Sequence, residues 1–490
     1  MIEALVIAVP ALPVACGLLV QLARTPAMAD RINLAGALLT AVCAGLLAIL
    51  ALVDSSSPTQ GAWYVVDGAT GAFVGVVAGV GLLSALVSPG YLASADRSIF
   101  RAARARAWYY LGFDLFWAAL LAIPLVNNLG VAWLLVEATT GASALLVAYS
   151  GRRSALEAGW KYLVLTTFGL TIALAGILVL YVGLAPHGGA LGTLNWQAIA
   201  RRAHSLPRED ALLAFLLIVG GLATKIGWAP VHNWLPDAHS EAPPPVSALL
   251  SAALLPTVIL VAWRVLVTLG PALRAGVGDA TFIAFGLASL AIAVPFLWRP
   301  LPWKRLLAYS SLEHMGVLAL GIGFASPLAT AGVLLHLAGH ALAKALGFYA
   351  AMPLLGHQPE SAERPPRGIA KLSTGTAAAI GVSLGSLSGL PPSPLFFSEL
   401  LILIGGIAAG HLVVALIAAA LLGLGFLGLA HALIEGLLGG EPHRPWPRGR
   451  SVRVTERLAT VIGLSLLVLA ACAYLLPGSA TVRMLMDGLT

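Results

Sequence analysis

Long apolar runs, separated by short polar or Pro- and Gly-rich breaks, follow one another along almost the whole chain. A bilayer core about 30 Å thick needs roughly 20 mostly apolar residues for one helical crossing. By this measure we expect an all-α polytopic membrane protein with about 14 transmembrane helices. The predicted spans are 2–22, 32–53, 70–88, 108–126, 129–149, 160–184, 211–229, 246–269, 279–298, 305–324, 328–354, 374–408, 410–437 and 457–476.

The composition agrees with a membrane protein and excludes a soluble enzyme. Of the 490 residues, 59% are hydrophobic and 10% are charged, whereas soluble domains carry about 25% charged residues. The longest polar stretches, near 185–210 and 438–456, are too short for a folded catalytic domain. Any chemistry must therefore take place within the bilayer.

The three cysteines, Cys16, Cys43 and Cys472, each lie alone in an apolar run. Because they form no CxxC pair and no other ligand spacing, we expect no zinc or iron–sulfur centre and no bound cofactor or metal. The formal net charge of +7 does not indicate a nucleic-acid partner, since the basic residues gather in loops on one side of the membrane.

The distribution of basic residues predicts the orientation of the chain. Of the 28 Lys and Arg residues, 19 lie in the loops after predicted spans 1, 3, 5, 9, 11 and 13. The positive-inside rule places these loops in the cytoplasm and both termini on the other side of the cell (inner) membrane. The first run has no basic start and no convincing cleavage site, so we expect a retained span rather than a signal peptide.

Two charged residues, one in the fifth and one in the seventh predicted span, indicate a proton path. A charge within the bilayer needs a partner, a water-filled cavity or a function. Glu137 lies in the middle of the fifth span, beside hydroxyl-bearing residues, and the alternative is a carboxyl that only bonds a neighbouring helix. Lys225 lies in the seventh span, directly before prolines that break a regular helix. A broken helix beside a buried lysine is typical of ion paths, and a desolvated amine can exchange protons near neutral pH.

Four polar residues follow Lys225 closely and are candidates for an uptake path from one membrane surface. They are His232, Asp237, His239 and Glu241. The alternative is that they belong to a solvated cytoplasmic loop, above all His239 and Glu241.

A stripe of three titratable residues lies on one face of the eleventh span. His336, His340 and Lys344 recur at every fourth position, so they extend over about 12 Å of a helix. Imidazole titrates near neutral pH and can accept a proton at one nitrogen while donating from the other, which favours a relay. The HxxxH spacing also suits a metal ion, but no third acidic or thiol ligand shares the segment. A purely structural stripe is the remaining alternative.

A second proline break, at Pro391, Pro392 and Pro394, interrupts the twelfth span just before Glu399. This repeats the pattern around Lys225, with small residues, a break and one buried charge. Two interrupted helices in corresponding positions indicate an internal repeat with ion sites at the breaks.

Glu313 and His314 place an acid and an imidazole side by side in the tenth span. We include both in the candidate proton path. The alternative is that they pair with Lys304 or Arg305 at the end of the helix.

One motif matches the dinucleotide-binding fingerprint by its letters alone. Gly423, Gly425 and Gly428 have the GxGxxG spacing, but they lie inside an apolar span with no preceding strand. We therefore interpret them as small residues at a helix–helix contact.

These segments together resemble the antiporter-like proton-channel subunits of respiratory complex I and its relatives. The resemblance covers about residues 100–440 and rests on KIGWAPVHNWLPDAHSEAPPPVSALLS, LLVEATTGASALL, the HxxxHxxxK stripe and GLPPSPLFFSE. Within that superfamily, Glu399 and the segment YSSLEHMG are most similar to the F-type membrane subunit of hydrogenase 4 and other group 4 nickel–iron hydrogenases.

The resemblance implies two inverted five-helix repeats with two broken helices. The implied regions are N-terminal helices in 1–107, a first repeat in 108–269, a second repeat in 279–437 and a last helix at 457–476. The chain ends soon after that helix, so we expect no long lateral helix.

The resemblance also implies roles for the charged residues. Glu137 and Lys225 would form an ion-paired switch, the stripe on the eleventh span would form the central relay, and Glu399 would take the distal position. In one departure, many relatives carry His or Lys in the eighth span where this chain has Ser251.

We therefore expect a proton-translocating subunit of a hydrogenase-4-like complex, with no catalytic centre of its own. Its expected partners are other membrane subunits and, through them, a peripheral redox arm. Three alternatives stay open. They are a cation/proton antiporter subunit, part of a proton-driven inorganic-carbon uptake complex, and a scaffold whose charges only hold helices in register.

Overall fold

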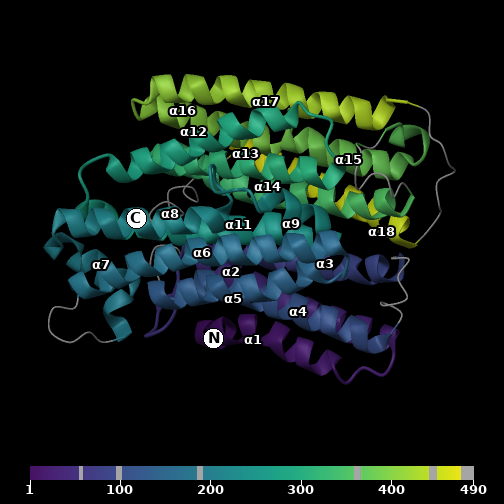
Figure 1. Cartoon of the computed structure of the whole chain (residues 1–490), viewed down its shortest axis with the longest axis horizontal. Helices are drawn as coiled ribbons and strands as arrows, with labels where there is room; N and C mark the ends of the chain where they lie inside the picture. The colour runs from purple at the N-terminus through teal and green to yellow at the C-terminus, as the bar shows by residue number, and fades with distance from the viewer. Residues whose placement is uncertain are drawn as a thin grey trace.

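The computed structural model is a bundle of long, nearly parallel helices that stack from α1 at one edge to α17 at the other (Figure 1). It describes residues 1–53, 59–94, 102–184, 191–357, 365, 367–440 and 450–475. Some basic residues of the predicted cytoplasmic loops lie outside these ranges, namely Arg97, Arg101, Arg364, Arg444 and Arg448.

The first half of the chain is coloured purple to teal in Figure 1. Its helices are α1 (Ile2–Val20), α2 (Pro26–Val53), α3 (Gly68–Ser94), α4 (Ala103–Ala122), α5 (Leu129–Ala148), α6 (Arg153–Leu184), α7 (Trp196–Arg202), α8 (Arg208–Ile226), α9 (Leu235–Glu241), α10 (Pro244–Leu249) and α11 (Leu255–Leu269). A π-helical turn, η5 (Leu250–Leu254), joins α10 to α11. Shorter elements are the antiparallel strands β1 (Thr59–Gln60) and β2 (Val65–Val66) and the 3-10 turns η2 (Ile123–Leu125), η3 (Leu191–Leu194), η4 (Ala203–Ser205) and η6 (Gly270–Ala272).

The second half, green to yellow in Figure 1, is also helical. Its helices are α12 (Val277–Leu297), α13 (Trp303–Gly323), α14 (Pro327–His357), the 3-10 turn η8 (Ile369–Lys371), α15 (Thr374–Leu387), α16 (Pro394–Ala408), α17 (Leu412–Leu438) and α18 (Arg450–Leu475).

The expected all-α polytopic membrane fold is confirmed. Within the described ranges, 11 helices are long and apolar enough to cross a membrane. The other predicted spans correspond to α8, to α15 with α16, and to α18, so every predicted span has a helical counterpart.

Both predicted helix breaks are present. α8 ends at Gly227, whose φ of +78° is a left-handed conformation that glycine adopts without a steric penalty. Beyond it, the Trp228 indole donates to the carbonyl oxygen of Met315 at 2.9 Å, and the Ala229 amide donates to the Ser289 hydroxyl at 3.1 Å. The first break is therefore anchored on α12 and α13 in the other half of the bundle. The second break separates α15 from α16.

α13, which carries Glu313 and His314, and the segment that follows the first helix break are the most deeply buried of the membrane-length helices in the described residues. The membrane-spanning windows of α13 and of the continuous segment 244–272 are 100% buried. α14 packs against α3, α10, α13, α15, α16 and α18. Since these helices face protein on all sides, their polar groups must find partners within the protein or in enclosed water.

Ion pairs join several predicted cytoplasmic loops at one end of the bundle. Arg152 pairs with Glu241 at 3.2 Å, while Asp237 pairs with Lys161 at 3.5 Å and with Arg305 at 3.0 Å. The segments around predicted spans 5, 7 and 9 therefore meet on the same side, as their shared orientation requires.

The close crossing of α6 and α8 predicts that alanine substitutions at two adjacent glycines differ sharply in their effect on stability. A Cβ at Gly221 would lie 2.5 Å from the backbone nitrogen of Ala173 and from the backbone oxygen of Gly169, whereas a Cβ at Gly220 would meet nothing within 4 Å. We expect Gly221→Ala to push the helices apart, destabilising the protein by about 1–3 kcal/mol. Tryptophan fluorescence during heating in detergent would show this as a lower melting temperature.

Gly220→Ala is the matched control. It adds the same methyl group to the same helix, where alanine is favoured over glycine by up to about 1 kcal/mol. Equal melting temperatures for the two variants would contradict the packing argument.

Candidate functional site

Lys225 lies fully buried in the last turn of α8. Its ammonium Nζ donates to Thr140 Oγ1 at 2.7 Å and to the Tyr162 hydroxyl at 2.5 Å. The same Nζ lies 4.5 Å from the centre of the Tyr162 ring. The Tyr162 hydroxyl also bonds Ser143 Oγ at 2.7 Å. Hydroxyl groups of α5 and α6 therefore replace the water that the amine has lost.

Glu137, one turn before Thr140 on α5, does not contact this amine. Its Oε1 accepts a hydrogen bond from Thr167 Oγ1 at 2.8 Å, and its buried Oε2 has no hydrogen-bond partner. Among the ion pairs of the described residues, none within 4.0 Å joins Glu137 to Lys225. The structure therefore shows the two groups separated, with Thr140 and Tyr162 holding the amine.

The predicted stripe on α14 is wholly buried. The His336 and His340 rings lie nearly parallel, with centroids 6.2 Å apart, and Lys344 Nζ donates to the carbonyl oxygen of Leu307 at 2.6 Å. His314 from α13 reaches the same face, and its Nδ1 lies 3.1 Å from His336 Nε2. Neither ring nitrogen of His340 has a hydrogen-bond partner.

A chain of hydrogen bonds fixes which nitrogens of His336 and His314 carry protons. Ser398 has one hydroxyl proton, which it donates to the Leu395 carbonyl at 2.8 Å, so it accepts from His336 Nδ1 at 2.8 Å. In the neutral ring, His336 Nε2 is then an acceptor for His314 Nδ1. His314 Nε2 is left as a buried acceptor without a partner. This series of hydrogen bonds therefore ends at His314 Nε2, a ring nitrogen that is free to accept a proton.

Glu399 joins this histidine pair across the second helix break. His314, His336 and Glu399 each offer one ligand atom, and these atoms all lie within 4.8 Å of one another. The carboxyl group also lies against the backbone of Gly389, where an added Cβ would be 2.8 Å from Glu399 Oε2. Three helices, α13, α14 and α16, therefore bring an acid and two imidazoles together.

Glu313 faces α17 rather than the basic end of its own helix. Its Oε2 is buried without a partner, and a Cβ at Gly425 would lie 2.0 Å from its Oε1. Arg305 instead pairs with Asp237, and Lys304 donates to backbone carbonyls at the end of α9. Two glycines of the GxGxxG motif, Gly425 and Gly428, therefore make room at helix contacts, as expected from the sequence, whereas a Cβ at Gly423 would meet nothing within 4 Å.

The four residues after Lys225 divide into two kinds. Asp237 and Glu241 are partly exposed and lie in ion pairs, whereas His232 is 8% exposed and His239 is 0% exposed. His239 stacks on Phe348 of α14 at 5.2 Å and interacts electrostatically with Lys344. A solvated loop is therefore wrong for His239, which lies beside the α14 stripe.

The sequence reasoning missed a pair of serines that borders the stripe. Ser251 lies in the π-helical turn η5, and its Oγ is 2.8 Å from Ser311 Oγ on α13. Ser311 donates to the Leu307 carbonyl at 2.9 Å, the same oxygen that accepts from Lys344. The sequence signal that could have identified this pair is the departure at Ser251, where many relatives carry His or Lys. The π-helical turn that carries Ser251 agrees with this signal, because such turns concentrate at functional sites.

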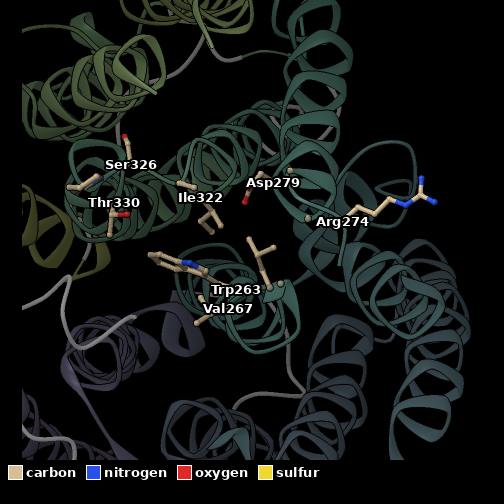
Figure 2. Close-up of a pocket in the computed structure, with 13 residues that line it drawn as sticks. Trp263, Val267, Arg274, Asp279, Ile322, Ser326 and Thr330 are labelled. Atoms are coloured by element: carbon tan, nitrogen blue, oxygen red, sulfur yellow. The ribbon is translucent and has the colours of Figure 1, made fainter. Parts of the chain in front are cut away.

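A cavity of about 380 Å³ opens between the ends of α11 to α14, at the end of α14 away from Lys344. Figure 2 shows Trp263, Ile322 and Asp279 facing this cavity, while the Arg274 side chain extends away from it. Thr330 also lines it, six residues before His336 on α14, or about 9 Å along the helix. The cavity therefore approaches the histidine cluster from one surface.

The hydrogen-bond order predicts the tautomer of His336. In neutral His336 the proton sits on Nδ1 because Ser398 accepts it. We expect Ser398→Ala to remove this preference, so that the population of Nδ1-protonated neutral imidazole falls. Nitrogen-15 NMR of protein labelled at histidine measures that population.

Ser465→Ala is the control, since Ser465 also donates to a helix carbonyl but lies exposed on α18. Identical spectra of the wild type and Ser398→Ala would contradict the assigned order.

Comparison with known proteins places the chain in a family. Residues 126–425 match the family described as NADH:quinone oxidoreductase/Mrp antiporter, transmembrane. The chain is 32% identical to the hydrogenase-4 component F homolog of Methylacidiphilum infernorum, over 85% of this chain and 86% of that protein. It is 31% identical to NADH-quinone oxidoreductase subunit N of Desulforudis audaxviator, over 81% and 78% of the two chains.

Two solved structures share the fold at 20% sequence identity. A chain of the Mrp complex from Dietzia sp. aligns over 100% of this chain and 96% of its own length, with a TM-score of 0.82. A chain of the archaeal membrane-bound sulfane sulfur reductase aligns over 99% of both chains, with a TM-score of 0.80. The chain belongs to the NADH:quinone oxidoreductase/Mrp antiporter transmembrane family, and it is an antiporter-like membrane subunit of the complex I and hydrogenase-4 type.

Proposed function

We propose that this chain translocates protons through the buried polar residues on α5, α8, α13, α14 and α16. One observation carries the proposal. Titratable side chains lie at both helix breaks, and hydrogen bonds to hydroxyls, imidazoles and carbonyls link them in ordered segments inside an apolar bundle. Buried polar groups of this kind mark proton relays in membrane proteins.

The proposed switch is the alternation of Lys225 between two sets of partners. In the state described here, hydroxyls hold the amine and Glu137 keeps one oxygen without a partner. Movement of the amine toward that oxygen would form the ion pair and favour a protonated lysine. Return to Thr140 and Tyr162 removes the counter-charge and favours release of the proton.

Ser251 and Ser311 form the proposed connection from Lys225 to the stripe. Hydroxyl groups can pass protons by donating and accepting in turn. Ser311 bonds the carbonyl that holds Lys344, and Ser251 bonds Ser311. This pair takes the place of the His or Lys that many relatives carry in the eighth span. Enclosed water would bridge the remaining gap between Lys225 and Ser251.

The proposed route continues from Lys344 through His340 to the cluster of His314, His336 and Glu399. The open nitrogens of His340 and of His314 accept the proton, and Glu399 or the cavity in Figure 2 leads it to the surface. His239 is the proposed uptake residue for this half, because it lies beside Lys344.

The proposed setting is a multi-subunit complex in the cell membrane, with both termini outside the cytoplasm. The named relatives are a component F homolog of hydrogenase 4 and a subunit of NADH-quinone oxidoreductase. We propose that partner membrane subunits connect this chain to a peripheral redox arm, which supplies the energy. The regions 108–269 and 279–437 would act as two inverted repeats, each with one broken helix.

Removal of the Lys225 amine tests the proton route. Lys225→Met keeps the length of the side chain but cannot bind a proton, so we expect proton flux in proteoliposomes of the complex to fall about 10²-fold. Lys371→Met is the control, since Lys371 is exposed and donates a surface hydrogen bond to the carbonyl oxygen of Gly440 at 3.1 Å. A scaffold role predicts the reverse, with a lower melting temperature and no specific loss of flux.

The metal content of the intact complex tests the proposed redox partner. After mild detergent extraction through a tag on this chain, we expect nickel and iron to co-purify and hydrogen to reduce an added dye. An intact assembly without these metals would contradict the hydrogenase-like partner. It would favour a cation/proton antiporter or a proton-driven uptake complex.

A further inference from the structure

We propose that His314, His336 and Glu399 form a binding site for a divalent transition-metal ion, with Zn²⁺ as the best-fitting ion. Metal binding at this cluster would stop the proposed proton route, and this second part alone rests on the proposed function. In the sequence, the HxxxH spacing lacked a third ligand. The fold supplies a different histidine pair and an acid from α13, α14 and α16.

The donor set is that of a zinc site. Two imidazole nitrogens and one carboxylate oxygen are common zinc ligands, and a fourth position can be taken by water. Zinc–nitrogen bonds of about 2.0–2.1 Å in a tetrahedron place neighbouring ligand atoms about 3.3 Å apart. His314 Nδ1 and His336 Nε2 already lie 3.1 Å apart, and all three ligand atoms lie within 4.8 Å of one another.

Second-sphere contacts orient the cluster for binding. Metal-bound histidines usually donate their other ring N–H to a carboxylate, carbonyl, hydroxyl or water, which turns the bonding lone pair toward the metal. His336 donates from Nδ1 to Ser398, so its Nε2 lone pair faces His314. His314 Nε2 has no partner, so it can take the proton that His314 Nδ1 must give up to bind the ion.

The surrounding charges favour a cation. Glu399 would release its proton on binding and bond the ion as a carboxylate, and Glu313, whose buried Oε2 lacks a hydrogen-bond partner, lies close enough to interact with it electrostatically. His340 adds two further unpartnered nitrogens beside His314, with the ring centroids 5.2 Å apart. Lys344 lies further along α14 and is held by the Leu307 carbonyl.

A bound ion would block the relay by occupying its acceptors. The lone pair of His336 Nε2 and the Glu399 carboxylate would bond the metal and could no longer accept protons. The same cluster would thus allow reversible inhibition by a metal.

The first experiment measures binding of Zn²⁺ alone to the full-length chain in detergent after chelator treatment. We expect one saturable site per chain and an X-ray absorption spectrum with two imidazole ligands and one carboxylate. The variants His314→Gln, His336→Gln and Glu399→Gln should each weaken binding by about 10-fold or more. Their elution on size exclusion and their helical circular dichroism should match the wild type.

His431→Gln is the matched control. His431 is an exposed histidine on α17 with Glu435 at 3.9 Å, so it represents a surface site of similar chemistry outside the cluster. Binding that is lost in His431→Gln but kept in the cluster variants would overturn the proposal, as would the absence of saturable binding.

A second measurement separates the metal site from the proton route. Proton flux of the complex in proteoliposomes should fall as Zn²⁺ fills the site and return on chelation. Binding at the cluster with undiminished flux would support the metal site and overturn the proposed proton route through it. Zn²⁺ affinity that is unchanged in Glu399→Gln, His314→Gln and His336→Gln would overturn the metal site and leave the route intact.

Discussion

The arrangement of this bundle depends on one constraint, the high free energy of a charge or an unpaired polar group away from water. Lys225 shows how the chain meets it. The helix that carries this lysine ends one residue later, at Ile226, and the lysine amine donates to hydroxyls from two other helices. The Tyr162 hydroxyl reaches it because α6 and α8 cross closely, where an added Cβ at Gly169 would lie 1.9 Å from Thr224 Oγ1. The close packing of these helices is therefore also what brings hydrogen-bond partners to the amine.

The two candidate regions meet this constraint in different ways. The Lys225 amine is bonded to the hydroxyls of Thr140 and Tyr162, although one oxygen of nearby Glu137 has no hydrogen-bond partner. Around the α14 stripe, several atoms are left without partners, including both ring nitrogens of His340. Each unbonded buried polar group costs about 1–3 kcal/mol. Such a concentration of open acceptors is retained where enclosed water, protons or ions use them.

The helix breaks give the charged residues their positions. A continuous helix bonds its own backbone and offers nothing to a neighbour, whereas a break exposes amides and carbonyls that need partners. At the first break these partners come from α12 and α13, so the Lys225 region is tied to the half that carries the histidines. At the second break, Gly389 lets the Glu399 carboxyl approach the backbone closely. The breaks therefore join the two candidate regions into one structure.

The sequence by itself determined the helical membrane fold, both breaks and the alignment of the α14 stripe on one helix face. Each of these follows from local physics, because apolar length, proline and residue spacing act within one segment. Only the tertiary structure decided which side chains meet. It separated Glu137 from Lys225, moved His239 to the α14 stripe, and assembled His314, His336 and Glu399 from three helices. Contacts between segments far apart in the chain depend on how helices rotate and cross, and no local pattern encodes that.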